Sequence, residues 1–365
     1  MGSIEHPNTL CNEMKEVKRD VKIAFRKPFY PVSPGLRDFL EKYNRLTKID
    51  LEYDDLLRFT DWSVVEDLKG KDTLWRSVYY NPTDFDEIRE GLKRIYTLLH
   101  SDGDRSVLPY LSVDSVDYCT FGNSKPFRIR VRNILNDIHT NFYIKKVDAS
   151  RIYGLEMEDL LSPNRANYLV YNDTLIEEHI WGIPGDVFIE DYLPNCSELD
   201  KTQIAKEFVK FNERCLTGLL GDMRSYNYVV VPTHDFDRVV YRIRPIDFDQ
   251  QCYEGNLKIY MPQYFKENFK MVDLVMKKLQ PKSVEQYRTE VRSLMVKRVT
   301  NSIVKFEYLV AIMRKDVLAP PENVVQLRTA LQKLTYNSQF RHCQTMGDIV
   351  HTGISFIVKN YKRPD

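Results

Sequence analysis

Residues 219–231 read LLGDMRSYNYVVV and residues 239–250 read VVYRIRPIDFDQ, and the interpretation of the whole chain depends on them. The first stretch follows a helical pattern, carries Asn227 five residues after Asp222, and continues into an apolar strand. The second is an alternating strand that ends in Asp247-Phe248-Asp249. Because a loop before one strand can meet the end of the next, we expect Asp222, Asn227 and Asp247 to converge.

Such a set of side chains suits phosphoryl transfer, which mainly requires a protein to position groups and neutralise charge. One carboxylate can orient an attacking hydroxyl and accept its proton, while an amide oxygen and a second carboxylate hold Mg²⁺. Taken alone, each motif is common by chance, and a surface turn explains it equally well. Their order, with each motif placed against a strand, favours the functional interpretation.

The chain upstream of these motifs predicts a small antiparallel sheet interrupted by one helix. Asn172-Asp173 between two apolar runs is typical of a hairpin turn, and Ser150 can cap the helix. The expected strands are 111–121, 127–131, 141–147, 168–171 and 174–180, and the expected helix is 151–161. Downstream, we expect a long helix at 200–220, two strands at 228–231 and 238–246, and a mainly helical C-terminus.

Residues 1–105 have a different sequence pattern from the strand-rich region that follows them. Helical periodicity occurs at 34–46 and 84–99, and the run SDGD at 101–104 is typical of a turn or linker. We therefore expect an accessory region at 1–105 that is mixed or largely helical.

With its elements in this order, the sequence resembles the protein-kinase-like superfamily over about residues 111–250. D-x-x-x-x-N, a strand pair and Asp-Phe-x are similar to the catalytic and metal-binding loops of protein kinases. Leu220-Gly221-Asp222 is nearer to the His-Gly-Asp of aminoglycoside-phosphotransferase-like kinases than to His-Arg-Asp, with Leu replacing His. Asp247-Phe248-Asp249 replaces Asp-Phe-Gly, as in several small-molecule and HipA-type kinases.

The resemblance implies an α+β, two-lobed protein-kinase-like fold with an extra N-terminal region. The implied domains are the accessory region 1–105, a sheet-containing N-lobe at 106–182 and a helical C-lobe at 183–365. It also implies that Asp222 is the catalytic base. Asn227 and Asp247 would then be metal ligands, with Asp249 as an extra ligand.

The run FYIKK at 142–146 resembles the Val-Ala-Ile-Lys strand whose lysine pairs with the ATP phosphates. Lys145 aligns most simply, and a register change of one residue selects Lys146, because only one of two neighbouring side chains can point inward. Glu156 or Glu158 is the implied partner of that lysine. The competing interpretation is a solvated strand edge for the lysines and a helix surface for the glutamates.

Two further segments resemble parts of a nucleotide site. Backbone groups of Glu178, His179 and Ile180 correspond to the hinge that bonds adenine. Gly122 marks the loop that covers the phosphates, and Lys125 can touch phosphate there. Packing is the alternative explanation for His179.

The bulk composition sets limits on other functions. A formal net charge of +1, from 53 basic and 52 acidic residues, gives no general argument for nucleic acid or an anionic membrane as partner. The N-terminus lacks a secretory pattern, and no uncharged apolar run approaches the length of a membrane span. Six scattered cysteines without a C-x-x-C pair favour reduced thiols in a cytoplasm.

The sequence therefore predicts a cytoplasmic kinase-like phosphotransferase that uses ATP and Mg²⁺. Its acceptor is a hydroxyl on an unidentified small molecule or protein. One alternative is a pseudokinase that acts as a binding or scaffold module, and another is nucleotidyl transfer from the same site.

Overall fold

The computed structural model describes residues 27–67, 69–120, 123–236 and 238–361. Contacts divide the chain into two compact units. Among the described residues, unit 1 contains 27–30, Ser150–Arg165 and 180–361, and unit 2 contains Pro31–Ala149 and Ala166–His179. The chain therefore passes between the units more than once.

Unit 2 is built on a seven-stranded antiparallel sheet with the order β1-β2-β3-β4-β5-β7-β6. A tight turn at Asn172, which has a positive φ of 47°, joins β6 to β7 and pairs Tyr171 with Thr174. The strands are β1 (Asp61–Glu66), β2 (Asp72–Tyr79), β3 (Leu111–Cys119), β4 (Phe127–Asn133), β5 (Ile138–Lys146), β6 (Tyr168–Tyr171) and β7 (Thr174–Glu178).

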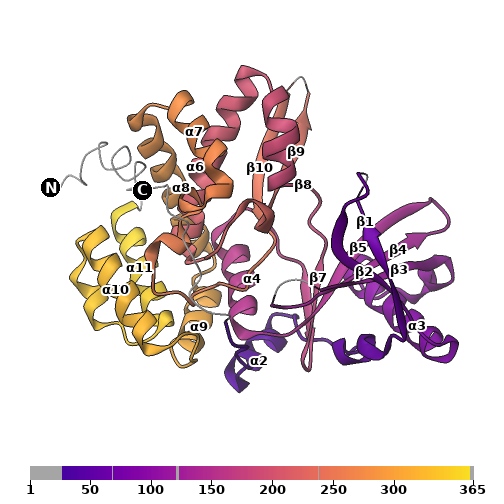
Figure 1. Ribbon diagram of the computed structural model, residues 1–365. Coiled ribbons are helices and arrows are strands. Elements are labelled where there is room, and N and C mark those ends of the chain that lie inside the picture. Colours follow the sequence, from indigo (N-terminus) through magenta and orange to yellow (C-terminus); the bar gives the residue numbers. More distant parts are fainter. Residues whose placement is uncertain (1–26, 68, 121–122, 237, 362–365) are drawn as a thin grey trace. The chain divides into compact units, whose positions relative to one another are not determined.

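One long helix of unit 2 covers this sheet. Helix α3 (Pro82–His100) packs against β3 and β4, as Figure 1 shows. The core lies between them, and its fully buried members include Ile88, Leu92, Ile95, Phe127, Ile129, Phe142 and Ile144. Helix α2 (Pro34–Lys42) begins at Ser33, whose hydroxyl accepts a hydrogen bond from the Leu36 N–H. Two 3-10 helices, Tyr53–Arg58 and Arg105–Tyr110, complete the unit.

The five strands and the hairpin expected from the sequence are confirmed, with ends that differ by a few residues. A largely helical extension at residues 1–105 is not shown: the described part of this region holds helices α2 and α3 and also two strands. Strands β1 and β2 lie at 61–79 and extend the same sheet through the pairing of β2 with β3. The burial of β1 does not alternate, because almost every one of its side chains is exposed, so the sequence lacks the usual strand pattern there.

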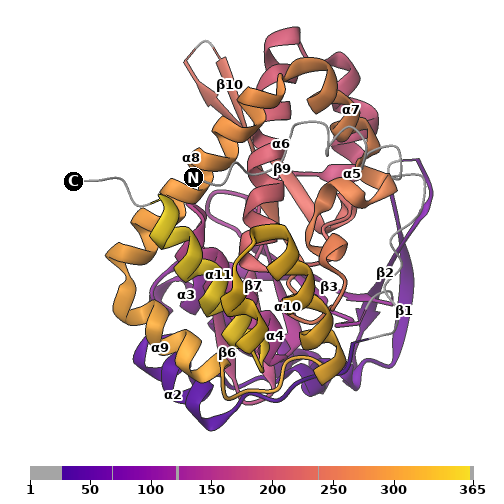
Figure 2. The same ribbon diagram turned by 90° about the vertical axis from the view of Figure 1, so that its left-hand side faces the viewer.

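Unit 1 is mainly helical, and Figure 2 shows its long helices α6 and α8 with α9, α10 and α11. Its α-helices are α4 (Ala149–Leu161), α5 (Gly185–Val187), α6 (Glu198–Gly218), α7 (Phe269–Lys278), α8 (Pro281–Asn301), α9 (Ile303–Met313), α10 (Pro321–Thr335) and α11 (Met346–Tyr361). A π-helical turn spans Phe188–Tyr192. The 3-10 helices are Leu193–Asn195, Ser225–Asn227, Leu257–Tyr260, Pro262–Tyr264, Lys266–Asn268 and Ser338–His342.

A small antiparallel sheet with the order β10-β9-β8 lies against helix α6. Its strands are β8 (Ile183–Pro184), β9 (Tyr228–Asp235) and β10 (Arg238–Pro245). Tyr228 pairs with Pro245, so β9 begins beside the end of β10. The expected long helix and strand pair are therefore confirmed, and so is the α+β class, with an antiparallel sheet followed by a helical region.

Helix α4 falls in unit 1, although the strands before and after it in the sequence belong to unit 2. The predicted domain division at 105 and 182 stays a prediction. Among the described residues, no helix combines the length and the apolarity needed to cross a membrane.

Candidate functional site

The loop that carries Asp222 is hydrogen-bonded to the segment that follows Asp247. After α6 ends at Gly218, Leu219 takes a left-handed conformation with φ 53° and turns the chain. The Gly221 N–H donates to the Gln250 carbonyl at 3.2 Å, and the Cys252 N–H donates to the Leu219 carbonyl at 3.0 Å. These two bonds fix the Asp222 loop beside the stretch that begins at Asp247.

A second set of contacts brings Asn227 to the same place. The Ile246 N–H donates to the Asn227 carbonyl at 3.0 Å, so Asp247 directly follows a residue bonded to Asn227. The Asn227 side-chain amide donates to the Asp222 carbonyl at 2.7 Å and lies 3.5 Å from the Asp222 carboxylate. Unit 1 therefore brings Asp222, Asn227 and Asp247 together, as the sequence predicts.

Asp222 is an unusual carboxylate in both its backbone and its electrostatics. Its φ of +58° lies in the left-handed region, and its side chain is only 15% exposed. Burial raises the pKa of the Asp222 carboxyl to about 6, against the lowering effect of Arg224. The neighbouring carboxylates of Asp247 and Glu267 raise that pKa further. A carboxylate with a pKa near the working pH suits a general base.

Arg224, which the sequence does not single out, holds this carboxylate and is itself bonded to Glu267. Arg224 donates from Nε to Asp222 at 2.9 Å and from Nη1 to Glu267 at 2.8 Å. Its guanidinium also lies 4.8 Å from the centre of the Phe265 ring. The sequence marks Arg224 only by its place two residues after Asp222, and Glu267 lies 43 residues after Arg224. The chain of charges from Asp222 through Arg224 to Glu267 is therefore visible only in the fold.

Asn227 and Asp247 have the chemistry that a magnesium site requires. The Asn227 amide nitrogen is bonded to the Asp222 carbonyl, which directs its oxygen away from that group. One Asp247 oxygen accepts the Asp249 N–H at 3.1 Å. Among the described residues, no three His, Cys, Asp or Glu side chains gather as a metal cage. Mg²⁺ is commonly held by one or two protein oxygens plus phosphates, so the pair fits.

Asp249 faces a different partner. Its carboxylate forms an ion pair with Arg151 of helix α4, whose side chain is 1% exposed. The role of Asp249 as an extra metal ligand stays a prediction, and its carboxylate is paired with a buried arginine.

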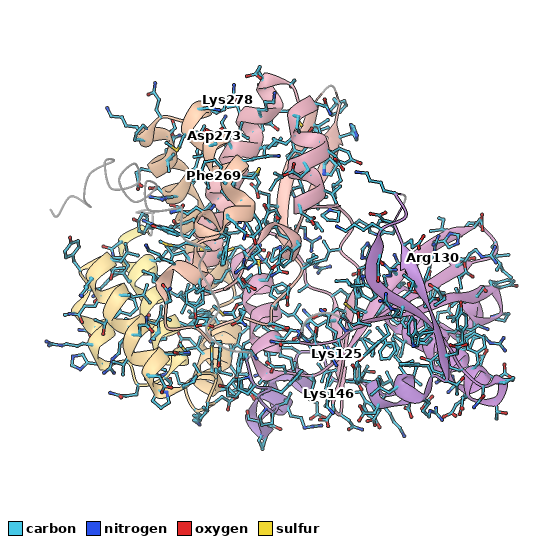
Figure 3. All side chains as sticks on the ribbon, viewed as in Figure 1. Lys125, Arg130, Lys146, Phe269, Asp273 and Lys278 are labelled. Carbon is cyan, nitrogen blue, oxygen red and sulfur yellow. The ribbon has the colours of Figure 1, made fainter. Side chains whose placement is uncertain are left out.

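The two candidate lysines lie in different environments at the end of β5. Lys145 is buried, forms an ion pair with Glu177 of β7, and lies 5.9 Å from the centre of the Tyr143 ring. Lys146 is half-exposed and 3.9 Å from Asp54, and Figure 3 labels it. Of the two, Lys145 is therefore the side chain that points into unit 2.

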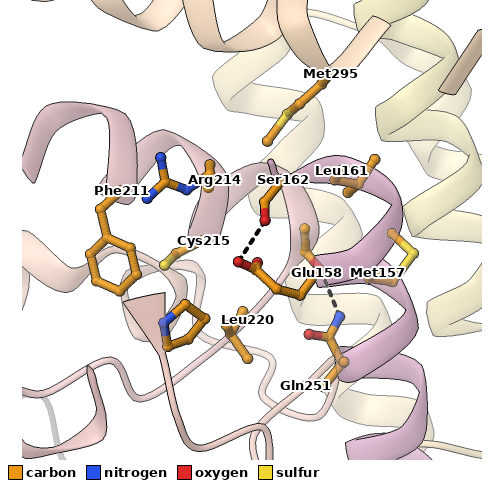
Figure 4. A pocket seen from close by; sticks show the side chains of 13 residues that line it. Met157, Glu158, Leu161, Ser162, Phe211, Arg214, Cys215, Leu220, Gln251 and Met295 are labelled. Atoms are coloured by element: carbon orange, nitrogen blue, oxygen red, sulfur yellow. Dashed lines mark hydrogen bonds between the residues drawn. The ribbon is translucent and has the colours of Figure 1, made fainter. Parts of the chain in front are cut away.

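The glutamates expected to pair with that lysine have other partners in unit 1. Glu156 is fully buried and pairs with Lys305 at 2.7 Å. Glu158 lines a pocket together with Arg214 and Gln251, and Figure 4 shows its bond from the Ser162 hydroxyl, which measures 2.7 Å.

The hinge-like residues lie at the end of β7. The chain passes from unit 2 to unit 1 between His179 and Ile180, where β7 has already ended. The Glu178 N–H donates to the Asn167 carbonyl at 3.0 Å. The His179 Nδ1 lies 3.2 Å from the Tyr143 hydroxyl. Burial lowers the pKa of His179, and the positive charge of Arg128 lowers it further.

The loop between β3 and β4 is only partly described. Gly122 lies outside the described residues. Lys125 is exposed, has a positive φ of 38°, and its carbonyl accepts a hydrogen bond from the Tyr53 hydroxyl at 2.9 Å. The contact of Lys125 with phosphate stays a prediction.

Comparisons with known proteins add similarity to solved structures. No family model matches the chain, and no curated protein matches it. Among solved structures, an ethanolamine kinase of Plasmodium vivax matches with 12% sequence identity and a TM-score of 0.26. The match covers 73% of this chain and 91% of that chain.

Proposed function

We propose that this protein is a kinase-like phosphotransferase that uses ATP and Mg²⁺ and transfers the γ-phosphoryl group to a hydroxyl acceptor. The observation that carries the proposal is the convergence of Asp222, Asn227 and Asp247, in which burial raises the pKa of Asp222 to about 6. The acceptor is a small molecule or a protein.

Asp222 acts on the acceptor. Its carboxylate orients the hydroxyl and takes the proton as the acceptor oxygen forms a bond to the γ-phosphorus, while the bond from that phosphorus to the bridging oxygen breaks. Arg224 limits how basic Asp222 becomes, because it donates a hydrogen bond to the same carboxylate. Asn227 and Asp247 would hold Mg²⁺, which supplies neutralisation of phosphate charge.

Lys145 is our choice for the residue that holds the ATP phosphates, with Glu177 as the partner that orients it. The lysine and the glutamate lie on the paired strands β5 and β7, and both side chains are 9% exposed. Lys146 is 46% exposed, which favours the solvated role for that residue. The backbone of residues 178–180 remains our candidate for binding adenine.

The test is ATP turnover by the purified protein with Mg²⁺ and a mixture of candidate acceptors. Asp222→Asn is expected to lower turnover by about 10²–10⁴-fold, the usual contribution of a general base, while ATP still binds. Asp247→Asn is expected to weaken binding that depends on Mg²⁺. Full turnover by folded Asp222→Asn protein would contradict the role of Asp222, and product masses distinguish phosphoryl from nucleotidyl transfer.

Asp273→Asn provides the matched control for these carboxylate variants. Asp273 is a half-exposed residue on helix α7 that pairs with Lys277, and Figure 3 labels it. We expect this variant to keep the turnover of the unmodified protein.

A second candidate function is a pseudokinase that acts as a binding module. The favouring observation is that Glu156 and Asp249 are paired with Lys305 and Arg151, respectively. Thermal unfolding with ATP, with and without Mg²⁺, separates the candidates. A shift that requires Mg²⁺, together with turnover, supports the enzyme, and a shift without turnover supports the binding module.

A further inference from the structure

Helix α4 is fastened to the segment that carries Asp247. Gly154 faces Phe248 so closely that an added Cβ would lie 2.9 Å from the Phe248 Cβ. The Tyr153 hydroxyl donates to Asp316 at 2.7 Å. At the other end of the helix, Arg298 donates from Nη2 to the Asp159 carbonyl at 2.7 Å. The helix therefore has a fixed place in unit 1, beside the residues on both sides of Phe248.

The charged contact in this packing is the ion pair of Arg151 with Asp249. The two side chains are 1% and 13% exposed, so both charges are largely removed from water. A buried pair contributes little net stability compared with apolar residues, but removing one partner leaves a charge uncompensated. The pair therefore makes the position of Asp249 depend strongly on Arg151.

Asp249 is in turn bonded to the proposed metal ligand. Its backbone N–H donates to one Asp247 carboxylate oxygen at 3.1 Å. A contact of this kind fixes the rotation of a ligating carboxylate and leaves its second oxygen for the metal. Arg151, the Asp249 side chain, the Asp249 N–H and Asp247 thus form one continuous chain of contacts.

We propose that Arg151 is a positioning residue, which sets the orientation of the Asp247 carboxylate through Asp249. In this assignment Asp249 is an anchor and does not bind metal, because its carboxylate is committed to Arg151. The inference rests on the proposed function, since it concerns how that site receives Mg²⁺.

The test measures binding of a non-hydrolysable ATP analogue at increasing Mg²⁺ concentration. Residues that orient metal ligands typically contribute about 10–100-fold to metal affinity, so Arg151→Met is expected to raise the half-saturating Mg²⁺ concentration by roughly tenfold or more. Binding of the analogue without Mg²⁺ is expected to stay unchanged. Arg151→Lys, which keeps the charge, is expected to restore part of the Mg²⁺ affinity.

A double-mutant cycle separates an anchor from a ligand. Arg151→Met, Asp249→Asn and the double variant are compared, and the double variant removes both charges so that neither is left buried alone. For an anchor, the double variant is no worse than either single variant, because all three break the same chain of contacts. Independent, additive losses of Mg²⁺ affinity would show that Asp249 binds the metal, and would overturn the proposal.

Arg298→Met is the matched control, because it removes an arginine that fastens the same helix α4 without touching residues 247–249. We expect it to leave the Mg²⁺ requirement unchanged. If Arg298→Met raised the half-saturating Mg²⁺ concentration as much as Arg151→Met does, Arg151 would only support helix α4, and the proposal would be overturned.

Hydrogen–deuterium exchange of the metal-free, nucleotide-free protein gives a readout that does not depend on binding. The amides of residues 246–250 are expected to exchange faster in the Arg151→Met/Asp249→Asn variant, and at the unmodified rate in Arg298→Met. Absence of Mg²⁺-dependent binding by the unmodified protein would refute the proposed function. Normal Mg²⁺ dependence in all Arg151 variants would refute this inference alone.

Discussion

At the scale of single residues, Asp222 has two features that each cost folding free energy, one in its backbone and one in its side chain. Its backbone lies at a positive φ, which is uncommon for residues other than glycine, although aspartate tolerates it better than most. Its carboxylate is also removed from water, close to two other acidic groups. Such costs are typical of residues kept for function, because a stabilising sequence would avoid both.

We predict that Asp222→Asn stabilises the nucleotide-free protein above about pH 6. The folded chain keeps the Asp222 proton up to about pH 6, whereas an unfolded aspartate loses it near pH 4. The folded state therefore binds more protons in this window, so the free energy of unfolding falls as pH rises through it and stays lower above it. Asparagine avoids this loss, which is on the order of 2–3 kcal/mol.

Urea unfolding in EDTA at about pH 4 and about pH 8 checks this expectation. The two proteins should have similar free energies of unfolding at the lower pH and should differ at the higher one. The same difference at both values would show that the ionisation of Asp222 is not its cause. Asp273→Asn, at a half-exposed position, is expected to change little at either pH.

At the scale of elements, helix α4 depends on a glycine for its approach to the Asp247 segment. We predict that Gly154→Ala destabilises the protein by about 1–3 kcal/mol, the usual cost of overpacking. Alanine normally favours a helix by about 1 kcal/mol over glycine, but here its Cβ would lie 2.9 Å from Phe248. Chemical unfolding measures the change.

Gly218→Ala at the end of α6 is the matched control, because its Cβ would meet Leu161 at 3.8 Å, an ordinary contact. We expect this variant to be as stable as the unmodified protein or slightly more stable. A loss of equal size in both variants would assign the effect to helix chemistry and not to Phe248.

The elements predicted from the sequence are those with a buried face. In β4, the apolar residues Phe127, Ile129 and Val131 alternate with arginines, and all three are fully buried. Strand β1 has no such face, because nearly all its side chains, including Trp62 and Val64, are exposed, and in β2 only Val78 is buried. Their pairing comes from backbone hydrogen bonds, which leave no hydrophobic period in the sequence.

The site follows the same division. The convergence of Asp222, Asn227 and Asp247 could be predicted because each lies at a fixed step from a strand. The partners Glu177 and Lys305 could not, because ion pairs between distant segments have no local pattern. The choice between Lys145 and Lys146 required knowing which face of β5 is covered.

At the scale of the whole molecule, unit 1 is not a continuous piece of chain. We predict that a fragment of residues 180–361 does not unfold cooperatively by itself, because it lacks helix α4, in which Ile152 and Tyr153 are fully buried. Co-expression with a peptide of residues 148–165 is expected to restore a cooperative thermal transition. A cooperative transition of the fragment alone would show that α4 is dispensable for the fold.

The interleaved path of the chain also has a consequence for biosynthesis. Helix α4 leaves the ribosome well before its partners Phe248, Arg298 and Asp316 have been translated. At usual rates of about 5–20 residues per second, the wait lasts on the order of 10–30 s. During that time the side chains of α4 that are buried in the folded protein lack these partners, so the nascent chain is a natural client for chaperones until those partners have been translated.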